Sequence, residues 1–438
     1  MKTHRKKKSI HVISLGCSKN LVDSEHLMAQ LEANDFEVFH DSAASPSGTV
    51  VINTCGFIHD AKQESIDVIL EQIKAKEEGR IDQVFVMGCL SQRYIRQLKT
   101  EMPELDGIVG VNSLAEVVQM VGGNYRKDLT GERLITTPSH YAYMKLSEGC
   151  DRKCSFCAIP LIRGGHVSRP REEIIAEARM LVEKGVREVM LIAQDLTYYG
   201  MDLYQKQSLA VLLEELASIR GLEWIRLHYA YPASFPVDLP AVIRDHENIC
   251  KYLDIPFQHI NNTVLQRMRR GINSRQTHAL IDKLRSEIPG LTLRTTLMVG
   301  HPGEDGKAFN ELKEFISSVR FDRLGVFQYS EEEGTWSARQ YRDTVPQKSK
   351  KERMDVLMEL QEGISLENNR KRVGGSYKTL IDRKEGEYYI GRTESDSPEV
   401  DNEVIIKAGQ TLKTGEFYTI KIHEANAFDL FGTVAEGE

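Results

Sequence analysis

Residues 148–157 read EGCDRKCSFC and place three cysteines, Cys150, Cys154 and Cys157, in the spacing CxxxCxxC. The apolar run over residues 141–146 that precedes them is typical of a strand. Three thiols this close can reach one metal centre, because a chain spans at most about 3.6 Å per residue. No fourth cysteine or histidine follows at the spacing of a closed zinc site, since the next histidine is His166. An iron–sulfur cube usually takes four cysteines, so three thiolates leave one iron open to a ligand that is not protein.

The loop cysteine set (Cys150, Cys154 and Cys157) resembles the signature of the radical S-adenosylmethionine (SAM) superfamily. In that superfamily the open iron of a [4Fe-4S] cluster binds SAM, and an electron from the cluster cleaves SAM to methionine and a 5′-deoxyadenosyl radical. The resemblance implies that the loop cysteine set holds such a cluster and that Phe156 lies beside the adenine. Buried thiols and an incomplete zinc site are the alternatives that the residues alone leave open.

The composition is that of an ordinary globular chain. Its 438 residues suggest about three domains, and its net charge of −7 gives no sign of DNA binding. The seven cysteines are sparse and mostly grouped, which favours reduced, metal-binding thiols in the cytoplasm over the disulfides of secreted proteins. The basic start, residues 1–8, is expected to be a solvated tail. No apolar stretch follows it that could act as a signal or a membrane span.

Residues 9–135 alternate short apolar strands with amphipathic helices, which predicts a doubly wound parallel α/β sheet. A cysteine comes just after each of three predicted strands, at Cys17, Cys55 and Cys89. Because the carboxyl ends of parallel strands share one edge of a sheet, the three thiols are expected to meet there. The alternative is three separate core cysteines, since free cysteine is often buried. The predicted strands are 10–15, 49–53 and 83–87, and the predicted helices are 24–33, 61–76 and 92–98.

This region resembles the amino-terminal domain of the methylthiotransferases. The residues that carry the resemblance are SLGCSKNLVDSE at 14–25, NTCGFI at 53–58 and GCL at 88–90. The resemblance implies that the amino-terminal cysteine set (Cys17, Cys55 and Cys89) holds a second [4Fe-4S] cluster. The first of these segments is similar to the branch that modifies an aspartate of small-subunit ribosomal protein twelve. The tRNA-modifying branch typically carries Gln-Met-Asn after the cysteine, and Ser18, Lys19 and Asn20 depart from it.

Residues 140–370 continue the strand–helix alternation and are expected to form a partial (β/α)6 barrel of the radical SAM type. A charged helix over 347–371 is expected to strap the barrel. In barrels the chemistry lies at the carboxyl ends of the strands. The polar residues and glycines at those ends are therefore the expected SAM pocket, together with Phe156: Gln194, Asp195, Gln258, Gly300 and Gly303. The predicted strands are 188–193, 224–229, 252–255, 291–299 and 324–327, and the predicted helices between them are 172–184, 209–219, 263–269, 275–287 and 308–319.

Several residues in this region have two open interpretations. Arg163 and Arg169 match the methylthiotransferase extension of the cysteine loop, and they either contact SAM or substrate or form surface salt bridges. His228 and His259 are either neighbours of the radical site or satisfied core histidines. Cys250 stands alone and is expected to be a core thiol.

Residues 371–438 change to short β runs, at 377–382, 388–393, 404–407, 417–423 and 430–434, which predict a small OB-like barrel. The region resembles the TRAM domain of methylthiotransferases and tRNA methyltransferases. From residue 370 to the end, ten Lys and Arg stand against thirteen Asp and Glu. An acidic loop (Glu394, Asp396, Glu399, Asp401 and Glu403) is expected to repel phosphates and to attract a basic ribosomal protein.

Together these resemblances imply a radical SAM methylthiotransferase that adds a methylthio group to the β-carbon of an aspartate in small-subunit ribosomal protein twelve. General acid–base residues cannot open such an unactivated C–H bond, so a cofactor radical is required. The loop cysteine set would serve the radical chemistry, the amino-terminal cysteine set the sulfur, and a second SAM the methyl group. The expected partners are that protein or the small ribosomal subunit and an electron donor such as flavodoxin, with no membrane and no DNA. The alternatives are a tRNA adenosine methylthiotransferase and a non-catalytic iron–sulfur protein that binds RNA or the ribosome.

Overall fold

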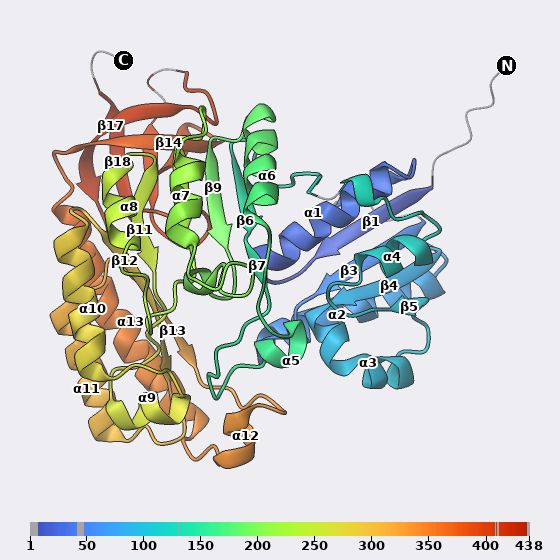
Figure 1. Cartoon of the computed structure of the whole chain (residues 1–438), viewed down its shortest axis with the longest axis horizontal. Coiled ribbons are helices and arrows are strands. Elements are labelled where there is room, and N and C mark those ends of the chain that lie inside the picture. The colour runs from blue at the N-terminus through green and yellow to red at the C-terminus, as the bar shows by residue number, and fades with distance from the viewer. Residues whose placement is uncertain (1–7, 42–47, 130, 408, 410, 436–438) are drawn as a thin grey trace. The chain divides into compact units, whose positions relative to one another are not determined.

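The computed structural model describes residues 8–41, 48–129, 131–407, 409 and 411–435, which form two compact units (Figure 1). The first unit holds the described residues up to 137 together with 148–151 and 158–167; the second holds the rest. The division between the two units therefore runs through the loop that carries CxxxCxxC: Cys150 belongs to the first unit, and Cys154 and Cys157 belong to the second. Residues 1–7, most of the expected solvated tail, lie outside the described part of the chain. Among the described helices, none is long and apolar enough to span a membrane.

The first unit is a doubly wound sheet, as predicted. Its five strands run parallel in the order β2-β1-β3-β4-β5. Alternate residues of β3 face opposite sides: Val51 packs with the helices α1 and α4, and Val50 and Ile52 pack with α2 and α3. The strands are β1 (Ser9–Ser14), β2 (Glu37–His40), β3 (Thr49–Thr54), β4 (Gln83–Gly88) and β5 (Gly107–Ile108), and the helices are α1 (Ser18–Glu32), α2 (His59–Glu77), α3 (Cys89–Glu101) and α4 (Leu114–Met120), with a short η1 (Lys127–Leu129) after them.

The second unit contains the six-stranded parallel sheet expected of the partial barrel, in the order β13-β12-β11-β10-β9-β6. Helices connect successive strands, and α13 (Gln347–Arg370) packs on β13 as the predicted strap. The strands are β6 (Tyr141–Lys145), β9 (Glu188–Ile192), β10 (Trp224–Leu227), β11 (Ile249–Asp254), β12 (Thr292–Val299) and β13 (Arg323–Gln328). The helices between them are α6 (Arg171–Glu183), α7 (Leu209–Ala217), α8 (Leu239–Asp245), α9 (Asn262–Met268), α10 (Ser274–Glu287) and α11 (Gly306–Val319), followed by α12 (Trp336–Gln340). Shorter elements complete the described chain: β7 (Ser147–Glu148), α5 (Ile159–Arg163), β8 (Val167–Ser168) and η2 (Leu196–Tyr198).

The carboxy-terminal strands close into a five-stranded barrel in the order β14-β15-β16-β18-β17, as predicted. Its interior is filled by aliphatic side chains such as Ile381, Val404, Ile420 and Leu430. The strands are β14 (Ser376–Glu385), β15 (Tyr388–Thr393), β16 (Glu403–Lys407), β17 (Phe417–Ala425) and β18 (Asp429–Val434).

Buried ion pairs join this barrel to the six-stranded sheet. Glu188, the first residue of β9, accepts hydrogen bonds from Arg226 of β10 at 2.8 Å and from Arg392 of β15 at 2.8 Å. Arg392 also donates to Asp382, which contacts His140 at 2.8 Å. Because these contacts lie at the amino ends of the sheet strands, the barrel covers the end of the sheet opposite to the expected SAM pocket.

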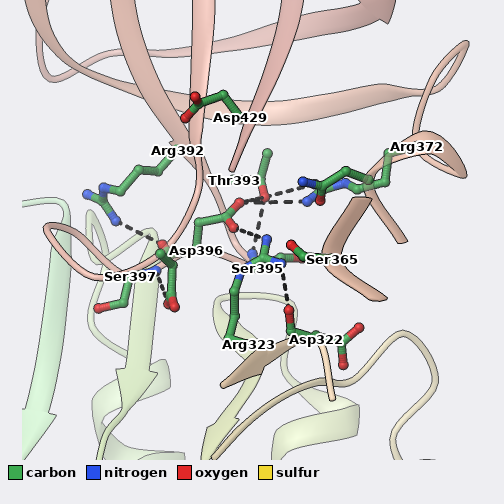
Figure 2. Close-up of polar contacts among 12 residues, drawn as sticks. Asp322, Arg323, Ser365, Arg372, Arg392, Thr393, Ser395, Asp396, Ser397 and Asp429 are labelled. Atoms are coloured by element: carbon green, nitrogen blue, oxygen red, sulfur yellow. Dashed lines mark hydrogen bonds and ion pairs between the residues drawn. The ribbon is translucent and has the colours of Figure 1, made fainter. Parts of the chain in front are cut away.

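The acidic loop is part of this junction, and the expectation that it attracts a basic substrate is wrong for its central residues. Asp396 is fully buried and pairs with Arg323 of β13 and with Arg372, as Figure 2 shows. Asp401 accepts hydrogen bonds from Tyr252 at 2.7 Å and from Arg294 at 3.3 Å. These carboxylates are neutralised by arginines of the same chain and present no free charge to a partner.

Replacing Glu188 is expected to destabilise the second unit strongly. Glu188→Gln leaves the buried guanidinium of Arg226 without its carboxylate and Arg392 with Asp382 alone, and breaking a buried ion pair costs about 3–5 kcal/mol. The measurement is the midpoint of urea unfolding. The matched control is Glu223→Gln, because Glu223 pairs with Lys378 across the same junction with 37% of its side chain exposed. An exposed pair of this kind contributes at most about 1 kcal/mol. Equal midpoints for the two variants would contradict the structural role of Glu188.

Candidate functional site

The amino-terminal cysteine set lies at one edge of the first unit's sheet. Cys17 follows β1 and precedes α1, Cys55 follows β3, and Cys89 begins α3 directly after β4. Since β1, β3 and β4 are neighbours in the sheet, their carboxyl ends bring the three cysteines together. A Cβ built on Gly16 would lie 2.8 Å from the Cys55 Sγ, which shows how closely the β1 end approaches that thiol. The topology thus places the three cysteines at one edge of the sheet, and their binding of a common cluster stays a prediction.

Charge couples the thiols of this set. Burial raises the pKa of Cys89 to about 11, and negative charge on Cys17 or Cys55 would raise it further, whereas the Arg163 guanidinium lowers it. Burial raises the pKa of the Cys55 thiol as well. These electrostatic effects show that the thiols of the set lie within range of one another.

Asn20 organises this edge of the sheet. Its side-chain amide donates to the carbonyls of Leu15 at 2.9 Å and Thr54 at 3.0 Å, so it ties the ends of β1 and β3 together. The Oδ1 of Asn20 lies 3.7 Å from the Cys89 Sγ and accepts a hydrogen bond from Arg163 Nη2 at 2.6 Å. One fully buried amide therefore fixes both strand ends and faces one thiol.

Arg163 is buried within the first unit and forms no surface salt bridge. Its Nη1 donates to Glu148 at 2.8 Å and to Asp23 at 3.2 Å, and its side chain is 1% exposed. Glu148 is two residues before Cys150, whose backbone N–H donates to the Gly164 carbonyl at 3.1 Å. Within this unit, Arg163 therefore links the start of the CxxxCxxC loop to Asn20 and the amino-terminal cysteine set.

In the second unit, Cys154 is in contact with a cation and a phenol. Arg270 Nη1 lies 3.1 Å from the Cys154 Sγ, and the Tyr231 hydroxyl lies 3.6 Å from the same sulfur. The backbone N–H of Cys157 donates to the Cys154 carbonyl at 3.2 Å, so a tight turn joins these two cysteines. Phe156 between them packs edge-on against His301 with ring centroids 6.3 Å apart.

The polar residues of the expected SAM pocket lie after their strands as predicted. Asp195 is buried, accepts a hydrogen bond from Arg152 Nε at 2.7 Å and caps η2. Gln194 beside it is half-buried. Gln258 has a left-handed backbone with φ 72°, a conformation that costs energy in a residue other than glycine. Its backbone bonds to Thr296 and Met298 extend β11 beside β12.

The glycine turn after β12 is filled by side chains of the chain itself. A Cβ on Gly300 would overlap the stem of Lys350, and a Cβ on Gly303 would lie 2.6 Å from the Arg267 Cδ. Both glycines have positive φ, at 78° and 100°. Only glycine suits these two positions, because the backbone is left-handed there and the side chains of Lys350 and Arg267 fill the space of a Cβ.

Two histidines near this turn are buried, and each has a partner. Burial lowers the pKa of His301 to about 4, so the ring is neutral at neutral pH. His259 Nδ1 accepts a hydrogen bond from the Asn261 N–H at 3.0 Å, and its Nε2 lies 3.4 Å from a carboxylate oxygen of Glu304. His259 is thus a buried histidine that lies against Glu304 of the turn.

Arg169, His228 and Cys250 each have contacts within the second unit. Arg169 binds the buried Glu177 at 2.6 Å and the Lys145 carbonyl at 2.9 Å. The His228 ring contacts Ser397 of the carboxy-terminal barrel at 3.1 Å. Cys250 is fully buried beside Trp224 and Tyr252, which confirms it as a core thiol.

The chemistry of the donor set suits iron–sulfur clusters, because soft thiolates are the ligands that such clusters prefer. Within the described ranges, no group of three His, Cys, Asp or Glu side chains is placed to hold a single metal ion.

Sequence reasoning missed four residues of these sites: Asn20 as a thiol neighbour, Arg152, Tyr231 and Arg270. Arg152 lies within the CxxxCxxC loop itself and Asn20 three residues after Cys17, whereas Tyr231 and Arg270 come close to a cysteine only through the fold. Tyr231 and Arg270 stand 77 and 116 residues after Cys154. No local spacing could have indicated them.

The comparisons with known proteins agree with this architecture. Three family models match in turn: the Uncharacterized protein family UPF0004 over residues 9–110, the Radical SAM superfamily over 144–316 and the TRAM domain over 373–435. The solved structure of the radical SAM methyltransferase TsrM from Kitasatospora setae, with cobalamin and a [4Fe-4S] cluster bound, is similar in fold. Its TM-score is 0.53 at 14% identity, over 74% of this chain and 75% of that one.

Curated relatives match over nearly the whole chain. Two of them are proteins named ribosomal protein uS12 methylthiotransferase RimO. The protein from Phocaeicola vulgatus is 55% identical over 98% of this chain and 100% of its own length. The protein from Cytophaga hutchinsonii is 53% identical over 98% of this chain and 98% of its own. By its domains and by this identity, the chain belongs to the RimO family of radical SAM methylthiotransferases.

Proposed function

We propose that this protein adds a methylthio group to the β-carbon of an aspartate in small-subunit ribosomal protein uS12. The observation that carries the proposal is the presence of two separate cysteine sets. A radical SAM enzyme needs only CxxxCxxC, whereas the amino-terminal cysteine set at the edge of β1, β3 and β4 provides a second iron–sulfur site. Methylthio transfer requires such a second site, because sulfur must be inserted as well as a radical formed.

The chain's own residues have distinct tasks in this function. When bound, two [4Fe-4S] clusters and SAM supply the radical and sulfur chemistry that amino-acid side chains lack. The loop cysteine set would hold one cluster and the amino-terminal cysteine set the other. Phe156, beside the neutral His301, offers an uncharged aromatic wall of the kind that suits an adenine ring. The proposed SAM-binding residues are Phe156, Gln194, Asp195, Gln258, Gly300 and Gly303.

The proposed partners follow from the same family. The relatives are named for uS12, and the SKN sequence after Cys17 resembles the protein-modifying branch. The substrate would be uS12, alone or within the small ribosomal subunit, and the reaction would take place in the cytoplasm. Electrons would come from a reduced protein donor such as flavodoxin.

Deleting the gene should remove the methylthio group from uS12. The measurement is the intact mass of uS12 together with nucleoside analysis of total tRNA, in the parent strain, the deletion strain and the deletion strain complemented with Cys154→Ala. We expect uS12 to lose the mass of one methylthio group in the deletion strain and in the Cys154→Ala strain, with tRNA nucleosides unchanged. Loss of a methylthio-adenosine from tRNA while uS12 keeps its mass would overturn the proposal.

A further inference from the structure

Arg270 is a buried cation that contacts a cysteine sulfur. The residue is 3% exposed, and its Nη1 lies 3.1 Å from the Cys154 Sγ. Its Nη2 donates to the Pro256 carbonyl at 2.5 Å, and its Nε has no hydrogen-bond partner among the described residues. A buried charge is costly unless an opposite charge compensates for it.

No carboxylate in the described part of the chain forms an ion pair with Arg270. Asp195 lies near enough for its charge to act on Arg270, but its carboxylate is hydrogen-bonded to Arg152 and to Thr197. The guanidinium therefore contacts the sulfur of Cys154 directly, and a cysteine that binds a cluster does so as the thiolate. An iron–sulfur cluster held by thiolates carries negative charge, so it fits a site that is already provided with a cation.

The local fold leaves Arg270 little freedom to move. Helix α9 ends in a Schellman motif, in which Arg269 takes a left-handed conformation and the Arg270 N–H donates to the Leu265 carbonyl at 3.1 Å. The last residue of α9 also bonds to the cysteine loop, since the Ser155 N–H donates to the Met268 carbonyl at 2.9 Å. Cys154 and Arg270 are thus fixed to one another through the backbone as well as through their side chains.

Tyr231 supports the guanidinium. Its ring lies 4.4 Å from the Arg270 Cζ, and its hydroxyl donates to the Arg270 carbonyl at 2.6 Å. Arg152 stacks on the same ring at 4.3 Å. Both guanidinium groups are therefore within the range of cation–π attraction to this ring. The hydroxyl also lies 3.6 Å from the Cys154 Sγ, so this phenol contacts both members of the charge pair.

We propose that Arg270 is the counter-charge of the Cys154 thiolate and raises the reduction potential of the iron–sulfur cluster bound there, with Tyr231 as its positioning residue. This inference rests on the proposed function, since it requires that the loop cysteine set holds a cluster. Hydrogen bonds to cluster sulfurs and nearby charge are among the features that set such potentials. Because the reduced cluster carries one more negative charge than the oxidised cluster, a neighbouring cation stabilises the reduced form.

The test is potentiometric electron paramagnetic resonance of the full-length chain in which the amino-terminal cysteine set is replaced by alanine, so that only one cluster contributes. In this parent, Arg270→Gln should lower the ratio of reduced to oxidised cluster about tenfold at a fixed potential. For a one-electron couple this corresponds to about 59 mV. Arg270→Lys should restore most of the shift, and Tyr231→Phe should give a smaller shift in the same direction as Arg270→Gln.

The matched control is Arg269→Gln, which removes an exposed cation one residue away. Solvent screens that charge, so the potential should stay at the value of the parent. Equal potentials for Arg270→Gln and the parent would overturn the inference while leaving the proposed function intact. If Arg270→Gln binds no iron, recovery of iron by Arg270→Lys supports the counter-charge, and failure of Arg270→Lys to bind iron overturns it. A parent that itself binds no iron would overturn both the inference and the proposed function.

Discussion

Cys154→Ala should abolish the formation of 5′-deoxyadenosine from SAM. Cys154 is one of three cysteines in the CxxxCxxC loop, and it is the one whose sulfur contacts Arg270 and Tyr231. Without this thiolate only two protein ligands remain for the cluster, and the buried Arg270 faces no anion. The assay is chromatography of 5′-deoxyadenosine after anaerobic reconstitution and chemical reduction.

The control for this variant is Cys250→Ala. Cys250 is also fully buried, but it packs in the hydrophobic core with Trp224 and Tyr252 and takes no part in either cysteine set. This variant should fold, bind iron and cleave SAM as the unaltered protein does. Equal loss of SAM cleavage in Cys154→Ala and Cys250→Ala would mean that the assay reports folding instead of the loop cysteine set.

Cys55→Ala should keep most of the SAM cleavage that Cys154→Ala loses, but it should stop methylthio transfer to uS12. Cys55 lies at the end of β3, so its replacement removes one thiol of the amino-terminal cysteine set and leaves the CxxxCxxC loop unaltered. The two products are measured in the same reaction, 5′-deoxyadenosine by chromatography and modified uS12 by mass spectrometry. If folded Cys55→Ala loses both products together, the two cysteine sets do not have separate tasks.

The cysteine sets and the folds that carry them could be predicted from local sequence. A cysteine follows each of the three strands predicted in the first unit, and the rule that parallel strands share a carboxyl edge is enough to place Cys17, Cys55 and Cys89 at the same edge. The starts of the helices were predicted less well. Helix α1 begins at Ser18 instead of residue 24, because the buried Lys19 and Asn20 at its start are polar and interrupt the apolar periodicity. Strands β2 and β5 were missed, since they are short and lie at the edges of the sheet.

The charged partners could not be predicted, because they are brought together only by the tertiary fold. Arg163 reaches Asn20 across 143 residues, and Arg323 reaches Asp396 across 73. The sequence places the aspartates of the acidic loop together but gives no sign of the arginines that bind them. This is why the loop was expected to be exposed and is instead largely buried against the six-stranded sheet.

The central claim is that this chain carries two independent iron–sulfur sites, and counting iron tests it most directly. The measurement combines chemical iron analysis with Mössbauer spectroscopy of the anaerobically reconstituted protein and of variants that lack one cysteine set. We predict about eight irons per chain as two cubes in the unaltered protein. Replacing either set by alanine should leave about four. An unaltered protein that saturates at about four irons, or that binds stoichiometric zinc in their place, would contradict the account.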